Sequence, residues 1–256
     1  MIEMKIDSSG LMKLKAKIVD MGKQTRFAAM RAINAAVREG AEKTKSEMRR
    51  VFDRPTPWVV GGVRYKKADK IRLEGAIDLD YWGNKQGVAV DQVLRAEIGG
   101  GGRRLKRHEI ALQRAGILPR GMAIVPGDAA KKDAFGNMSA GQIVQIIAYF
   151  RVFGEQGYKA NIDDKGRKRL ATDKRKSGQR GFVYFALRAP RGKLPPGIYQ
   201  RFQSAFGSAI KPVMIFVRAP TYRRRLDFYG VAGKAALAEF DRSFPKFFDE
   251  AMKSAK

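Results

Sequence analysis

The sequence predicts an α+β protein in which a long N-terminal helix and a C-terminal helix pack on an antiparallel sheet, with a mixed, partly flexible insertion. Residues 22–52 and 227–255 repeat apolar side chains at the spacing of an amphipathic helix. Short apolar or alternating segments between them are typical of strands. Because helices and strands are segregated along the chain, an antiparallel sheet is favoured over a parallel one.

The N-terminal quarter predicts a strand followed by helices. Apolar and charged residues alternate over residues 1–7, which is the pattern of a half-buried strand. Residues 11–21 predict a short helix, Gly22 a break, and the next residues a long helix that continues to about Phe52. Pro55 then ends the helix, because proline disfavours helical backbone in the residue before it.

Residues 58–66 and 71–81 predict a pair of strands. In the second segment, apolar residues alternate with charged and small ones, as in a strand with one buried face. Asp78 and Asp80 are two residues apart and therefore share a face, which the alternation assigns to solvent.

The middle of the chain predicts three short helices. Residues 91–98 form the first, which the four glycines at 99–102 stop. Residues 106–115 form the second. Ser139 caps the third, which extends to about Phe150.

Residues 154–180 predict a flexible basic loop. Between residues 159 and 180, nine Lys or Arg accompany three Asp and few apolar residues. Such a composition buries too little apolar surface to offset the entropy of ordering. We expect the loop to become ordered only on contact with a partner.

The last third predicts strands at residues 182–187, 198–202 and 211–218, followed by the C-terminal helix. The apolar run at 213–217 indicates burial on both faces of its strand. Pro245 is expected to kink or split the helix.

The 256 residues are enough for one large domain or two small ones. We expect one α+β core domain that combines residues 1–82 with 181–256. Residues 83–180 are then an inserted helical and loop region that includes the basic loop.

The net charge of +27, from 52 Lys and Arg against 25 Asp and Glu, favours a polyanionic partner. Nucleic acid, an acidic protein surface and a membrane headgroup layer all fit this charge. No apolar stretch approaches the length needed to cross a bilayer, and the N-terminus lacks the apolar core of a signal peptide. We therefore expect no membrane partner.

Candidate catalytic residues are few, and we expect no enzyme activity, cofactor or metal. The chain has no cysteine, and its single histidine, His108, has no second histidine at the spacing of a zinc site. The pairs Asp78–Asp80 and Asp163–Asp164 could hold Mg²⁺, but solubility and local charge balance explain them better.

Two basic clusters are the candidate contacts with a partner or polyanion. One follows Tyr222, where arginines beside an aromatic residue suit phosphate or carboxylate groups. The other lies in the basic loop. The candidate residues are Arg223, Arg224, Arg225, Lys168, Arg169, Lys174, Arg175 and Lys176. Replacing the three arginines with alanine is expected to leave the fold intact and to yield defective particles if the chain is a virion protein.

Several stretches together carry a family resemblance. The strand, lysine-rich turn and Ala- and Arg-rich helix of residues 1–46 resemble the start of the tail-completion and neck-protein superfamily of long-tailed bacteriophages. Residues 194–199, 211–217 and 222–225 resemble prophage proteins related to the lambda minor tail protein Z, as do parts of residues 106–147.

The resemblance implies a structural virion protein that completes the tail or joins it to the head. It also implies a homo-oligomeric ring whose partners are tail-tube, tail-terminator or connector subunits, with possible nonspecific contact with phage DNA. The expected location is the virion, and the host cytoplasm during assembly. The alternative is a free nucleic-acid-binding protein without sequence preference.

Overall fold

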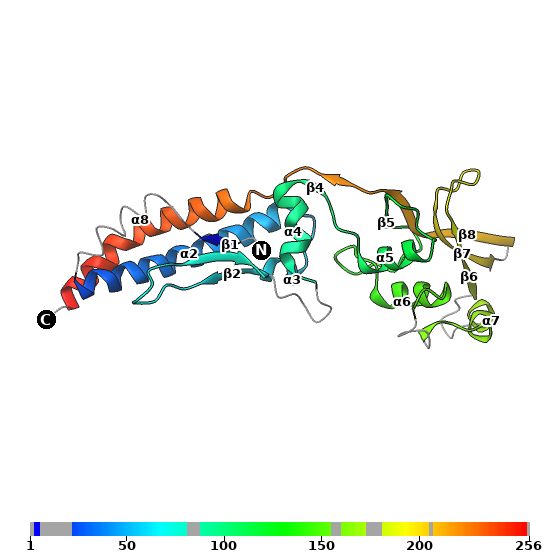
Figure 1. Cartoon of the computed structure of the whole chain (residues 1–256), viewed down its shortest axis with the longest axis horizontal. Helices are drawn as coiled ribbons and strands as arrows, with labels where there is room; N and C mark the ends of the chain where they lie inside the picture. The colour runs from blue at the N-terminus through cyan, green and yellow to red at the C-terminus, as the bar shows by residue number, and fades with distance from the viewer. Residues whose placement is uncertain are drawn as a thin grey trace. The chain divides into compact units, whose positions relative to one another are not determined.

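A computed structural model confirms the α+β class and divides the chain into two compact units (Figure 1). Unit 1 comprises Met1–Gly101 with Tyr222–Lys256, and unit 2 comprises Gly102–Thr221. The structure describes residues 3–5, 22–80, 88–154, 160–172, 181–204 and 207–254.

The division differs from the expected one, in which residues 181–221 belonged to the same core as the N-terminus. Strand β8 (Gly207–Arg218) instead pairs with β5 (Met122–Pro126), a strand that the sequence analysis did not predict. The pattern of residues 211–218 indicates a buried strand but carries no information about its partner, so the assignment to the N-terminal sheet was wrong.

Unit 1 contains two long helices and a small sheet. The sheet has the antiparallel order β1-β3-β2. The elements are β1 (Glu3–Lys5), α2 (Lys23–Val51), α3 (Pro57–Gly61), β2 (Val63–Lys66), β3 (Ala76–Leu79), α4 (Val90–Gly99) and α8 (Phe228–Ser254).

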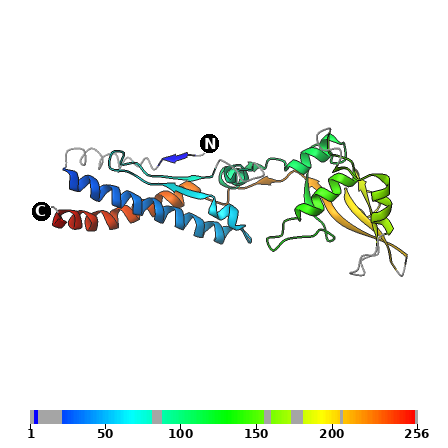
Figure 2. The ribbon, with the colours of Figure 1, turned by 90° about the horizontal axis from the view of Figure 1, so that it is seen from below.

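Helix α2 packs against both the sheet and α8, which Figures 1 and 2 show on opposite sides of it. Gly40 lies where all three meet. A Cβ on Gly40 would come within 2.6 Å of the Ile77 Cδ1 atom and 2.8 Å of the Ala232 carbonyl oxygen. The absence of a side chain there allows the close approach of α2 to both neighbours.

The predicted apolar stripe of α2 is buried, and it includes Ile33 and Val37. Helix α8 runs through Pro245 as one element, so the predicted split does not occur. Residues 57–61 form α3 rather than part of a strand, because the Thr56 hydroxyl accepts a hydrogen bond from the Val59 amide and Pro57 starts the helix. The helix predicted at 11–21 lies outside the described residues.

Unit 2 is built on a four-stranded antiparallel sheet with the order β5-β8-β7-β6. The other elements are α5 (Arg107–Arg114), α6 (Ala140–Tyr149), α7 (Asp164–Thr172), β6 (Phe182–Leu187) and β7 (Gly197–Ser204). Strands β4 (Gly101–Gly102) and β9 (Thr221–Tyr222) form a separate two-stranded sheet.

The core of unit 2 gathers side chains from the sheet and its helices. Val213 and Met214 of the central strand β8 are fully buried, as their apolar run predicts. The predicted cap of α6 is confirmed, because the Ser139 hydroxyl accepts a hydrogen bond from the Gln142 amide. In the described part of the chain, no helix has the length and apolar character needed to cross a membrane.

Candidate polyanion-binding surface

Part of the predicted basic loop is helical, so the prediction of a wholly flexible segment was wrong. Helix α7 occupies Asp164–Thr172, and the preceding Asp163 carboxylate accepts a hydrogen bond from the Gly166 amide. This contact caps the first turn, and Lys and Arg are good helix formers. Lys174, Arg175 and Lys176 lie outside the described residues.

The inner side of α7 is fixed to the rest of unit 2. The Arg167 guanidinium donates to the Tyr149 carbonyl oxygen at 3.1 Å and stacks 5.0 Å from the centre of the Tyr149 ring. Arg151 forms a salt bridge with Asp164 at 2.6 Å. Leu170 packs against the core of the unit. These contacts order a segment that is too polar to fold by itself.

The outer side of α7 carries Lys165, Lys168 and Arg169, which we call the α7 basic face. The three residues are three and four positions apart, so they share one side of the helix. All three are exposed, and none has a carboxylate within salt-bridge distance among the described residues. Lys168 and Arg169 were predicted as contacts; Lys165 joins them because the segment is helical.

The positive charge is concentrated in unit 2. This unit has 24 Lys and Arg against seven Asp and Glu, whereas unit 1 has 28 against 18. Many cations of unit 1 are neutralised by nearby carboxylates, for example Lys45 by Glu42 and Arg64 by Asp80. The strong field that favours a polyanion therefore belongs mainly to unit 2.

The second predicted cluster, Arg223 to Arg225, lies in unit 1 and is mostly engaged in internal contacts. Arg225 forms a bidentate salt bridge with Glu97, at 2.7 and 2.9 Å, and stacks over the Phe52 ring. Arg224 pairs with Asp227. Only Arg223 has no side-chain partner among the described residues, so this cluster offers a partner one free guanidinium rather than three.

We expect Arg225→Ala to destabilise unit 1 by about 1 kcal/mol, the upper range for a partly exposed ion pair. Arg223→Ala should leave the stability unchanged and serves as the control. Urea unfolding followed by tryptophan fluorescence measures this, because both tryptophans, Trp58 and Trp82, belong to unit 1. Equal stability of the two variants would contradict the structural role of Arg225.

Asp78 and Asp80 are less accessible than predicted. The Asp78 side chain is 7% exposed and lies 3.5 Å from the Lys66 ammonium, and Asp80 pairs with Arg64 at 3.2 Å. The solvent-face prediction was wrong because β3 is the central strand and long side chains of β2 reach across it. Within the described ranges, no group of three or more metal-ligating residues is assembled.

Glu109 of α5, which was not among the predicted site residues, organises one side of unit 2. Its buried carboxylate accepts hydrogen bonds from the Arg103 guanidinium at 2.6 and 2.8 Å and from the amides of Lys106 and Ile124. Burial opposes ionisation, but these four donors outweigh it and lower the pKa of Glu109 to about 2. A Glu at the third position of a helix is the only sequence signal of this role.

His108, the neighbouring residue on α5, is half-buried. Burial, with a further contribution from the positive charge of Lys106, lowers the pKa of His108 to about 4. The imidazole is therefore neutral near pH 7.

Comparison of the chain with family models, with curated proteins and with solved structures found no match. The proposed function therefore rests on the charge distribution of the structure and on the resemblance seen in the sequence.

Proposed function

We propose that the protein is a structural virion protein of a long-tailed bacteriophage that completes the tail or joins it to the head. Its unit 2 contacts the phosphates of the packaged or passing DNA. The DNA contact is supported by the excess of cations on unit 2, including the exposed α7 basic face, which has no salt-bridge partner among the described residues. The virion role rests on the resemblance of residues 1–46, 194–199, 211–217 and 222–225 to phage tail-completion and minor tail proteins.

Phosphate contact explains this arrangement better than recognition of bases. Three cations on the outer side of a nine-residue helix can neutralise neighbouring phosphates without inserting a side chain into a groove. A subunit that repeats around a DNA channel gains from such contacts whatever sequence passes. The proposed partners are further copies of the chain in a ring and the tail-tube, tail-terminator or connector subunits beside it.

The second candidate is a free nucleic-acid-binding protein. The helical α7 favours it more than a loop would, since a rigid element can present side chains to a groove. The two candidates differ in two respects: whether virion assembly requires the protein, and whether binding depends on DNA sequence.

Genetic complementation tests the proposal. The gene is disrupted in the phage or prophage that encodes the chain, and the variant Lys165→Glu/Lys168→Glu/Arg169→Glu is supplied in trans. We expect the disruption to leave heads and tails unjoined in electron micrographs, and the wild-type chain to restore virions. The charge-reversed variant should fail to do so. Normal virion yield after the disruption would overturn the proposal.

A titration on two unrelated DNA duplexes separates the second candidate. We expect equal affinities for the two sequences and a steep loss of affinity with salt. Replacing the three cations of the α7 basic face with alanine should reduce the log–log salt slope by up to about 2.7, or 0.9 per phosphate contact. The matched control, Arg49→Ala/Lys234→Ala/Lys246→Ala, removes three exposed cations of unit 1. A marked preference for one duplex would favour the free DNA-binding protein.

A further inference from the structure

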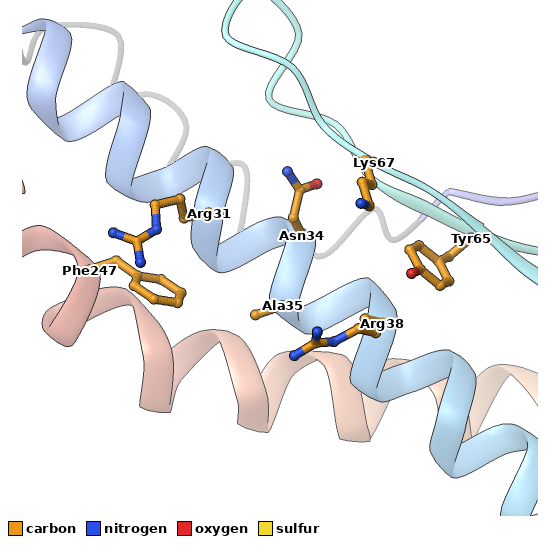
Figure 3. A pocket seen from close by; sticks show the side chains of 7 residues that line it. All are labelled: Arg31, Asn34, Ala35, Arg38, Tyr65, Lys67 and Phe247. Atoms are coloured by element: carbon orange, nitrogen blue, oxygen red, sulfur yellow. The ribbon is translucent and has the colours of Figure 1, made fainter.

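Unit 1 contains a small open pocket that is separate from the α7 basic face (Figure 3). It has a volume of about 280 Å³ and lies between α2, the end of β2 and α8. Its polar and aromatic lining is Arg31, Asn34, Arg38, Tyr65, Lys67 and Phe247. Among the described lining residues, three are therefore cations and none carries a carboxylate.

Two of the polar lining residues are held in place by the fold. The Arg31 guanidinium lies 4.1 Å from the centre of the Phe247 ring and forms a salt bridge with Glu250 at 2.8 Å. The Asn34 side chain donates to the Ala68 carbonyl oxygen and accepts from the Ala68 amide. The Arg31 contacts hold the α2 wall of the pocket against α8. The Asn34 hydrogen bonds hold α2 against the segment that follows β2.

The other polar groups are available to a ligand. Arg38 and Lys67 are exposed, and neither has a hydrogen-bond or ion-pair partner among the described residues. The half-buried Tyr65 likewise has no partner for its hydroxyl there. Arg38 on α2 thus offers guanidinium donors on one side of the pocket (Figure 3). On the other side, Tyr65 of β2 offers a hydroxyl and Lys67, just after β2, an ammonium.

We infer that this pocket binds an acidic side chain presented by a partner protein. The planar guanidinium of Arg38 matches a carboxylate in two parallel hydrogen bonds, and Lys67 adds a second charge. The volume lies below the range usual for small-molecule sites, and a single side chain needs less room than a cofactor. Arginine and tyrosine are also enriched in the centres of protein interfaces.

The inference goes beyond the proposed function, because it concerns a protein partner and residues of unit 1 rather than DNA and unit 2. It holds whether or not the chain is a virion protein.

Calorimetric titration of the full chain with an acetylated tetraglutamate peptide tests the pocket. We expect Arg38→Ala/Lys67→Ala to weaken binding roughly tenfold or more, because both charged donors to the peptide carboxylate are lost. Both residues are exposed and have no described partners, so the melting temperature should not change.

The matched control is Arg49→Ala/Lys234→Ala, which removes the same charge from exposed positions of α2 and α8 away from the pocket. We expect a loss of affinity of less than about threefold, from the weaker overall field. Equal losses in both double variants would show that the peptide senses net charge alone and would overturn the inference. Inorganic phosphate that binds as tightly as the peptide, with the same dependence on Arg38 and Lys67, would also overturn it.

Discussion

Replacing Ile33 with aspartate is expected to destabilise unit 1 by roughly 4 kcal/mol or more. Ile33 is 8% exposed and lies in the core that α2 shares with the sheet and α8. The substitution removes a buried aliphatic side chain and leaves a carboxylate there without a partner, and each change costs several kcal/mol. Since a domain is stable by only about 5–15 kcal/mol, a large part of its stability is lost.

Urea unfolding followed by tryptophan fluorescence measures this loss, because both tryptophans belong to unit 1. Leu237→Asp is the matched control: it also introduces an acid for an aliphatic residue, but Leu237 of α8 is 38% exposed. We expect the control to change the unfolding free energy much less. A variant Ile33→Asp that is as stable as the control would show that the stripe on α2 is not a core face.

The long helices were predictable because their signal is local. Periodic apolar residues define α2 and α8, and a capping serine defines the start of α6. Each pattern depends on neighbours within a few residues, so it can be read without knowing the fold.

The division of the strands between the two units was not predictable in the same way. Strand β8 shows its burial through its composition, but its pairing with β5 joins residues about ninety positions apart. Asp78 illustrates the same limit, because alternation assigned it to solvent while its position on the central strand β3 buries it beside Lys66. Both errors arise from contacts between segments that are distant in the sequence.

The candidate site was predictable in part. Charge density alone singled out Lys168 and Arg169. Their common face with Lys165 depends on the formation of α7. That helix is held in place by two further arginines, Arg151 before it and Arg167 within it. Composition treats every cation as solvated and cannot distinguish those that hold the fold from those that remain free. For the same reason, Arg225 was predicted as a partner contact although it forms an internal salt bridge with Glu97.

Acid should weaken unit 2 through Glu109. The pKa of Glu109 is lowered in the fold from 4.5 to about 2, so the unfolded chain takes up a proton before the folded chain does. The ionised carboxylate therefore stabilises the fold fully above about pH 4.5, and this contribution is lost as the pH falls towards 2. At pH 7 it amounts to about 3 kcal/mol, from 1.36 kcal/mol for each pH unit between the two pKa values.

Glu109→Gln should consequently destabilise unit 2 by about 3 kcal/mol at pH 7, because the Arg103 guanidinium loses its anionic partner. Hydrogen exchange of peptides spanning residues 103–126 measures this, since the Lys106 and Ile124 amides bond directly to Glu109. The difference between wild type and variant should shrink between pH 4.5 and 2. His108, whose pKa is lowered to about 4, adds an acid sensitivity between about pH 6.5 and 4. The charge of Glu109 partly offsets this lowering of the His108 pKa, so the added sensitivity is larger in the variant.

Glu47→Gln is the control for this experiment. Glu47 also has a lowered pKa, through its hydrogen bond to Arg50, but the pair lies at the surface of α2, where solvent screens it. The control should leave exchange of the 103–126 peptides unchanged at every pH. A constant difference between wild type and Glu109→Gln from pH 7 to 2 would show that packing, rather than the charge of Glu109, holds α5 to β5.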